Sequence, residues 1–122
     1  MPVEAVTQYI DAYNAGDDER LLQVCHDAIF VIHHNRPEFG ASSKAALREV
    51  LRNSKTALAN KRFTDRRALY VIGENVIVEH TCRGTAVADI PGIAKRGDSV
   101  ALDLCTRFTV RDGLIVEYHD YG

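Results

Sequence analysis

The stretch VALDLCTRFTVRDGLIVEYHD, residues 100–120, decides the fold because it holds two alternating runs with a turn between them. Apolar and polar side chains alternate along 98–110 and again along 114–121, which is typical of strands with one buried face. Asp112 and Gly113 separate the runs, and Asp-Gly is a strong signal for the tight turn of a β-hairpin. The stretch therefore predicts two antiparallel strands joined by a hairpin.

The alternation also predicts which side chains of this hairpin face the core. In the first strand the more apolar row consists of Val100, Leu102, Leu104, Thr106, Phe108 and Val110. In the second strand the more apolar row consists of Leu114, Val116, Tyr118 and Asp120. An acidic residue at the end of an apolar row either lies at a solvated strand end or points into the mouth of a cavity.

Three more strands are expected upstream, at 28–34, 62–72 and 75–89, where β-branched and aromatic residues are frequent. The last two are separated by Gly73-Glu74-Asn75, which favours another hairpin. The segment 86–99, which contains Ile90-Pro91-Gly92-Ile93, either closes a pocket or only connects two strands. Sequential strands without crossover helices predict a mainly antiparallel sheet.

Three helices are expected before these strands. Val6, Ile10 and Tyr13 lie on one face of a first helix that ends at Gly16. Asp17 or Asp18 is expected to cap a short second helix, and Ser42 or Ser43 a third. Helices at the start of the chain and hairpins at its end define an α+β fold in one domain, residues 1–122.

Composition excludes several classes of protein. The chain of 122 residues has 15 Lys+Arg against 17 Asp+Glu and a net charge of -2, which gives no general attraction for nucleic acid or an anionic membrane. No apolar run is long enough to span a bilayer, and the acidic start does not resemble a secretion signal, so a cytoplasmic location is expected. Cys25, Cys82 and Cys105 show no metal or redox spacing and are expected to be free thiols.

Several motifs together resemble the NTF2-like superfamily, and most closely its SnoaL-like branch. They are a Tyr-x-x-x-x-Asn-Ala-Gly-Asp run at 9–17, Asp27-Ala28 before a strand, and the run from Arg107 through 112–117 to Asp120. The resemblance implies a cone-shaped α+β barrel, in which a strongly curved sheet wraps around helices and encloses a deep apolar pocket. It also implies a homodimer through the outer sheet face, which the mixed polarity of that face favours as well.

The resemblance implies candidate catalytic residues position by position. Aligned with ketosteroid isomerase, Tyr9 falls on the tyrosine of the oxyanion hole and His33 on the position of the base. Leu104 stands at or next to the position of that enzyme's second acid, so this donor is absent. Asp120 matches an acid near the end of the last strand in related epoxide hydrolases and cyclases.

These residues favour proton transfer without a cofactor or metal. His33 can take up and return a proton near neutral pH, Tyr9 can donate to an enolate oxygen, and Asp120 can hold the histidine tautomer or act as partner acid. Adjacent His33 and His34 point to opposite sides of a strand and cannot bind one metal together. Residues expected to contact the substrate are Tyr13, Phe30, His80, Leu102, Leu104, Phe108 and Tyr118.

The sequence thus predicts a small-molecule pocket protein with isomerase, cyclase or dehydratase chemistry on an apolar substrate that bears a carbonyl or hydroxyl group. The alternative is a ligand-binding or dimerisation module of the same fold that has no turnover. A transport adaptor has only the shared fold in its favour, and a fold alone does not define a function. Two or more polar side chains that converge on one cavity would favour catalysis.

Overall fold

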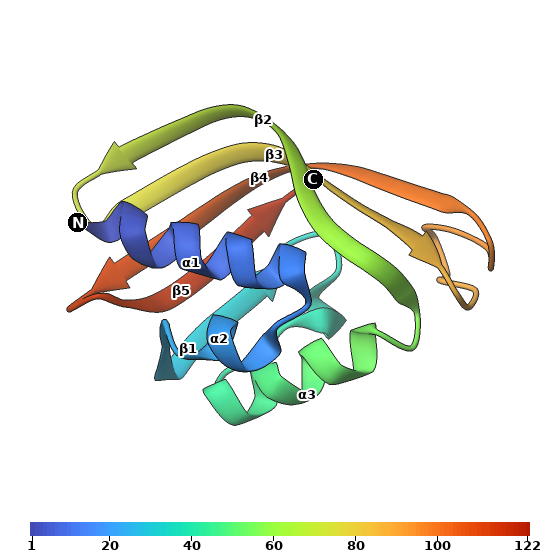
Figure 1. Ribbon diagram of the computed structural model, residues 1–122, viewed down its shortest axis with the longest axis horizontal. Coiled ribbons are helices and arrows are strands. Elements are labelled where there is room, and N and C mark those ends of the chain that lie inside the picture. Colours follow the sequence, from blue (N-terminus) through green and yellow to red (C-terminus); the bar gives the residue numbers. More distant parts are fainter.

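The computed structural model describes residues 1–122 and combines helices in the first half of the chain with a five-stranded sheet (Figure 1). In chain order the elements are α1 (Pro2–Ala15), α2 (Asp18–Leu22), β1 (Cys25–His33), the 3₁₀ helix η1 (Pro37–Phe39), α3 (Lys44–Ser54), β2 (Leu58–Ile72), β3 (Asn75–Ala86), β4 (Ser99–Arg111) and β5 (Leu114–Tyr121). The strand order is β1-β5-β4-β3-β2. β1 runs parallel to β5, and all other neighbouring strands are antiparallel. The predicted α+β class is confirmed.

The helices begin and end at the residues that the sequence singled out. Gly16 follows α1 in the left-handed region, at φ 71°, which glycine adopts without steric cost. Asp17 caps α2 by accepting a hydrogen bond from the backbone N–H of Arg20, and Ser43 caps α3 by accepting from that of Ala46. None of the helices has the length and hydropathy of a membrane-spanning segment.

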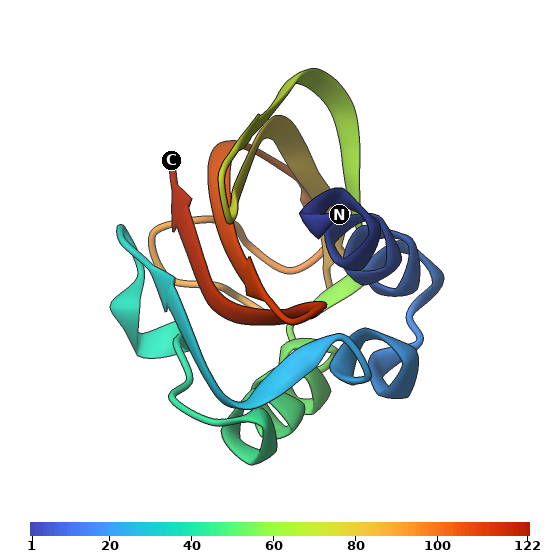
Figure 2. The ribbon, with the colours of Figure 1, turned by 90° about the vertical axis from the view of Figure 1, so that its left-hand side faces the viewer.

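The sheet is strongly curved, and the helices cover its concave side (Figure 2). α1 packs across β2 and β4, whereas α3 packs against β1 near the opposite edge. Asn60 and Asp65 in β2 have positive φ angles near the places where its register with β3 shifts, which marks two bends in this edge strand. This curvature leaves space between the sheet and the helices.

The strands differ from the expected ranges mainly at their ends. β2 begins at Leu58 rather than at residue 62, and β3 ends at Ala86 rather than at residue 89. β1 begins at Cys25, three residues earlier than expected. Residues 87–98 form a loop with a single isolated bridge between Ile90 and Ala94.

The predicted inner face of β5 is wrong in its first half. Ile115 is fully buried, whereas Leu114 and Val116 are partly exposed. The register shows the reason, because Glu117 pairs with Thr109 and Ile115 pairs with the next residue, Val110. Val116 is thus an extra residue, and such a bulge reverses which side chains face inward. Beyond it Tyr118 and Asp120 face the core, as predicted.

The inner face of β4 is as predicted, and it supports the centre of the core. Phe108 is completely buried and meets the rings of Tyr9 and Tyr118 edge-on, at centroid distances of 5.4 and 5.2 Å. These three side chains come from β4, α1 and β5, so they fix the main helix on the sheet.

Candidate functional site

A mostly apolar cavity of about 450 Å³ lies between the concave side of the sheet and helices α1 and α3. Its wall includes apolar side chains from both helices, from the sheet and from the β3–β4 loop, among them Val31, Leu47, Leu51, Leu102, Leu104 and Ile93. A cavity of this size and polarity can hold a small organic molecule. The polar side chains in its wall therefore decide what it can do chemically.

His33 and Asp120 form a hydrogen-bonded pair in this wall. His33 Nδ1 lies 2.5 Å from Asp120 Oδ2, and the two side chains are 27% and 7% exposed. Tyr118 donates its hydroxyl proton to the same carboxylate oxygen over 3.1 Å. The other oxygen, Asp120 Oδ1, accepts no hydrogen bond from the protein. Because Asp120 occupies Nδ1 of His33, Nε2 is the nitrogen that remains to accept a proton.

The sheet topology brings these two residues together although they are 87 positions apart in the sequence. β1 and β5 lie side by side, and His33 pairs directly with Asp120 in their parallel register. The backbone N–H of His34 donates to the carbonyl oxygen of Asp120 over 3.0 Å, which fixes this end of the two strands. Both side chains face the cavity because residues opposite each other in a sheet project from the same face.

Tyr9 presents an uncommitted hydroxyl group to the same cavity. Its side chain lines the cavity and is only 3% exposed, and its oxygen makes no hydrogen bond with the protein. Every fully buried side-chain oxygen or nitrogen in the protein has a hydrogen-bond partner. The Tyr9 hydroxyl has none, so its oxygen is not fully buried and opens to the cavity. Burial raises the pKa of Tyr9 well above its usual value, and electrostatic interactions with Cys25 and Asp120 raise it further. Tyr9 therefore stays protonated and can donate a hydrogen bond to a ligand oxygen.

The residues that were expected to contact a substrate fall into two groups. Tyr13, Leu102, Leu104 and Tyr118 line the cavity, together with the three candidate catalytic residues. Phe30, His80 and Phe108 do not line it, and their expected positions have to be corrected. Phe30 projects from the outer face and is 40% exposed, whereas Phe108 lies beneath Tyr9 and Tyr118 in the solid core.

His80 is a core residue rather than a ligand contact. Its side chain is 2% exposed, stacks on Phe63 at 4.3 Å between ring centroids, and has Nε2 2.9 Å from the hydroxyl of Thr106. Burial lowers its pKa from 6.5 to about 4, and the positive charges of Arg66 and Arg67 contribute. His80 is therefore neutral in the folded protein at neutral pH.

The lowered pKa of His80 predicts a loss of stability in mild acid. The unfolded chain takes up a proton at His80 below about pH 6.5, whereas the folded protein does so only near pH 4, so the stability falls as the pH drops through this interval. The expected loss is at most about 3 kcal/mol. Urea unfolding of the wild type and of His80→Gln at several pH values checks it. If the free energy of unfolding fell with pH by the same amount in both proteins, the lowered pKa of His80 would be contradicted.

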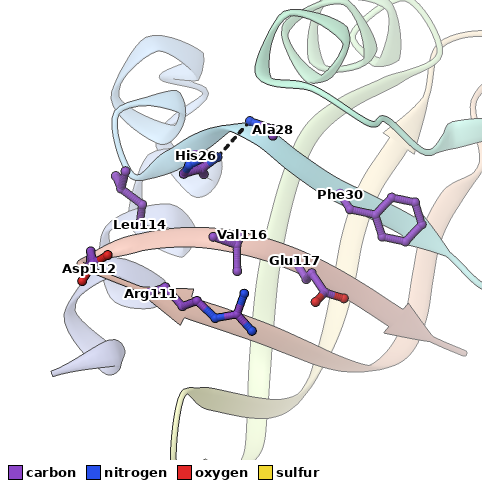
Figure 3. Close-up of a pocket in the computed structure, with 8 residues that line it drawn as sticks. All are labelled: His26, Ala28, Phe30, Arg111, Asp112, Leu114, Val116 and Glu117. Atoms are coloured by element: carbon purple, nitrogen blue, oxygen red, sulfur yellow. Dashed lines mark hydrogen bonds between the residues drawn. The ribbon is translucent and has the colours of Figure 1, made fainter.

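A second, shallow hollow lies on the outer side of the molecule, where β1 diverges from β5 (Figure 3). The register between these strands shifts between Cys25 and Phe30, and His26 accepts a hydrogen bond from the backbone N–H of Ala28 within the shifted segment. The hollow lies between that segment and Val116 in β5. Its polar lining residues are His26, Arg111, Asp112 and Glu117, and no side-chain hydrogen bond joins any two of them.

The sequence left several residues of the cavity wall open or unassigned. Ile90 and Ile93 belong to the segment that was expected either to close a pocket or only to connect two strands, and both line the cavity. Ser54 at the end of α3 and Lys61 in β2 line it as well. In the sequence, Lys61 belongs to a basic group with Arg62, Arg66 and Arg67 at the start of a strand. This group favours a solvated strand edge, with contact to an anionic substrate group as the alternative. Its place in the wall depends on the early start and the bends of β2, for which no local pattern exists.

The fold and the site together define a class of protein. A curved sheet that encloses an apolar cavity with helices is the architecture of ketosteroid isomerase-like and NTF2-like domains. The family profile of the SnoaL-like domain matches residues 6–118. The chain therefore belongs to the SnoaL-like domain family. No curated protein matches the sequence.

Solved structures show the same fold at low sequence identity. A putative polyketide cyclase from Xanthomonas campestris pv. campestris is 21% identical with a TM-score of 0.86, and the match covers 99% of this chain and 89% of that one. TerC, co-crystallised with polyporic acid, is 22% identical with a TM-score of 0.80 over 98% and 89% of the two chains. A ketosteroid isomerase-like protein from Catenulispora acidiphila DSM 44928, in complex with trimethylamine, is 18% identical with a TM-score of 0.80 over 98% and 85%.

Proposed function

We propose that this protein catalyses proton transfer on an apolar small molecule that bears a carbonyl or hydroxyl group, without a cofactor. The observation that carries the proposal is the contact between His33 Nδ1 and Asp120 Oδ2 in the cavity wall. A histidine whose tautomer is fixed by a carboxylate is a well-suited general base. The small molecules bound in the two solved relatives, polyporic acid and trimethylamine, agree with a pocket of this kind.

The first step of the proposed reaction is removal of a proton from the carbon next to a carbonyl group. Nε2 of His33 accepts this proton, and Asp120 stabilises the resulting imidazolium through Nδ1. The electron pair of the broken C–H bond moves toward the carbonyl oxygen and forms an enolate. Tyr9 donates a hydrogen bond to this oxygen, where the negative charge develops.

The second step returns the proton and determines the product. When the enolate is conjugated with a C=C bond, transfer from His33 Nε2 to the far carbon of that bond shifts the double bond and gives an isomer. When a hydroxyl group is attached next to the enolate carbon, its C–O bond breaks as a C=C bond forms, and the proton leaves with it as water. Attack of the enolate carbon on a second carbonyl of the same molecule gives a ring, with the proton ending on the new hydroxyl oxygen. Isomerisation, dehydration and cyclisation therefore need the same three side chains.

Hydrogen exchange on a simple ketone tests this function without knowledge of the natural substrate. In D₂O, the protein is expected to accelerate deuterium uptake at the activated C1 position of 2-tetralone, followed by NMR. Addition of 2-naphthol, which has a similar shape but no such C–H bond, is expected to suppress the acceleration by competing for the cavity. Binding of 2-tetralone without accelerated exchange would instead favour the module that binds without turnover.

We further propose that two copies of the chain associate through the outer face of the sheet. Phe30 and Tyr121 are exposed there, at 40% and 44%, and lie beside a stacked pair of histidines, His34 and His119. Light scattering at micromolar concentration is expected to give twice the chain mass of 13.6 kDa. Phe30→Glu is expected to give the monomer mass. A monomeric wild type would contradict this proposal and leave the proposed chemistry unaffected.

A further inference from the structure

One cation in the cavity wall has no acidic partner. Lys61 is half-buried in the wall, and no carboxylate oxygen lies within 4.0 Å of its ammonium nitrogen. Two other lysines differ in this respect, since Lys44 pairs with Asp27 at 3.6 Å and Lys55 pairs with Asp18 at 2.8 Å. The charge of Lys61 is thus unbalanced by the protein at close range.

The ammonium group of Lys61 is held in position but keeps unused hydrogen-bond donors. It donates to the hydroxyl oxygen of Ser54, whose own proton goes to the carbonyl oxygen of Leu51 over 2.8 Å. The nitrogen also lies 5.0 Å from the centre of the Tyr13 ring, a cation–π distance. An ammonium group has three donors, and Ser54 takes one of them. Burial lowers the pKa of Lys61, and the charge of Asp18 offsets only part of this effect.

The other charged groups of the wall are placed differently. Arg36 donates from both terminal nitrogens to the carbonyl oxygen of Gly122, at 3.2 and 3.0 Å, and keeps three of its five donors free. Glu38 is an exposed carboxylate, and Asp120 binds His33 and Tyr118. Lys61 is the wall cation whose nitrogen lies over the ring of Tyr13, beside α1.

Lys61 and the proton-transfer pair lie beside successive turns of α1. The ring of Tyr9 is 5.6 Å from that of Tyr118, which binds Asp120, whereas the ring of Tyr13 carries Lys61 on its face. Positions four apart on a helix are separated by roughly 6 Å along its axis. A ligand that contacts both Lys61 and the His33–Asp120 pair is thus at least about 6 Å long, roughly the length of one six-membered ring.

We propose that Lys61 binds an anionic group, a carboxylate or phenolate, on the apolar molecule that the cavity takes up. This inference rests on the proposed function only in placing the ligand in the same cavity. The anion satisfies the open donors of Lys61, and its contact with the ammonium group fixes the orientation of the ligand. The reactive C–H bond then faces His33 and Tyr9 at the other end, so Lys61 determines specificity and takes no part in the proton transfer.

Two probes that differ in charge but hardly in shape test this inference, namely 2-naphthoate and 2-naphthamide. The wild type is expected to bind 2-naphthoate roughly 10-fold or more tightly than 2-naphthamide, since hydrogen bonds to charged groups are stronger than neutral ones. Lys61→Met is expected to remove this preference, so that 2-naphthoate binds no more tightly than 2-naphthamide. Lys61→Arg keeps the charge and is expected to keep the preference.

The matched control is Lys55→Met, which removes a lysine that is paired with Asp18 outside the cavity wall. This variant is expected to bind both probes as the wild type does. Lys61→Gln is a second neutral variant, should Lys61→Met fail to fold. A wild type without charge preference, or a neutral variant that retains it, would overturn the inference. Binding of neither probe would overturn it too.

The result separates this inference from the proposed chemistry. 2-Tetralone is uncharged, so its exchange does not require Lys61. Accelerated exchange without charge preference would reject only the anion site. Charge preference without accelerated exchange would reject only the proton-transfer function.

Discussion

Replacing Asp120 by Asn is expected to slow the exchange of 2-tetralone protons by roughly 10²- to 10⁴-fold, the usual contribution of a general base. Asn has nearly the same shape, and the site is 7% exposed, so the fold should tolerate it. It lacks the negative charge that holds the Nδ1 proton of His33 and stabilises the imidazolium. Nε2 then loses both its basicity and its fixed tautomer. NMR in D₂O measures the rate.

Three further variants show whether His33 and Asp120 act as a unit. His33→Ala and the double variant His33→Ala/Asp120→Asn are expected to be about as slow as Asp120→Asn, because members of one catalytic unit are not additive. Tyr118→Phe removes only the hydroxyl that donates to Asp120 and is expected to cost much less. An Asp120→Asn protein with nearly wild-type exchange would sink the proposed mechanism.

Replacing Phe108 by Ala is expected to lower the free energy of unfolding by about 3–5 kcal/mol. The side chain is completely inaccessible, and its ring contacts those of Tyr9 and Tyr118 from below. Truncation leaves a void that the curved sheet cannot close, because Val76 and Thr106 beside it are already fully buried. Urea unfolding followed by circular dichroism gives the difference.

Phe39→Ala is the matched control for this truncation. The same atoms are removed from a side chain that is 44% exposed at the end of η1, and the expected cost is below about 1 kcal/mol. Phe108→Leu restores part of the volume and is expected to recover more than half of the loss. Equal costs for Phe108→Ala and Phe39→Ala would show that Phe108 is not the centre of the core.

Much of the fold could be predicted because its signals are local. Gly16, Asp17 and Ser43 mark helix ends through their own backbone and side-chain chemistry. The Asp112-Gly113 turn likewise depends only on residues next to it, and Gly113 takes the positive φ that it requires. Strand ends were less predictable, since the start of β2 depends on pairing with β3 far along the chain.

The candidate site could be predicted only in part. Tyr9, His33 and Asp120 were found through a resemblance that assigns positions, and the structure places them in one cavity wall. His80 was assigned to the pocket because it lies in one row of its strand with Val76, Val78 and Cys82, but such a row shows the face of a strand and not the position along it. For Lys61 the sequence favoured a solvated strand edge and left contact with an anionic substrate group as the alternative, because two bends in β2 determine where it points.

The extra residue in β5 has a consequence for how this site can change. Side chains alternate between the two surfaces of a sheet, and the extra residue Val116 shifts this alternation by one position within β5. Deleting Val116 would remove no reactive atom. It would, however, place Ile115 on the opposite surface of the sheet from Tyr118 and Asp120, so either Ile115 would leave the core or Tyr118 and Asp120 would leave the cavity side. Insertion or deletion of a single codon here is therefore expected to move a whole set of side chains to the opposite surface, an effect that no single substitution in β5 can have.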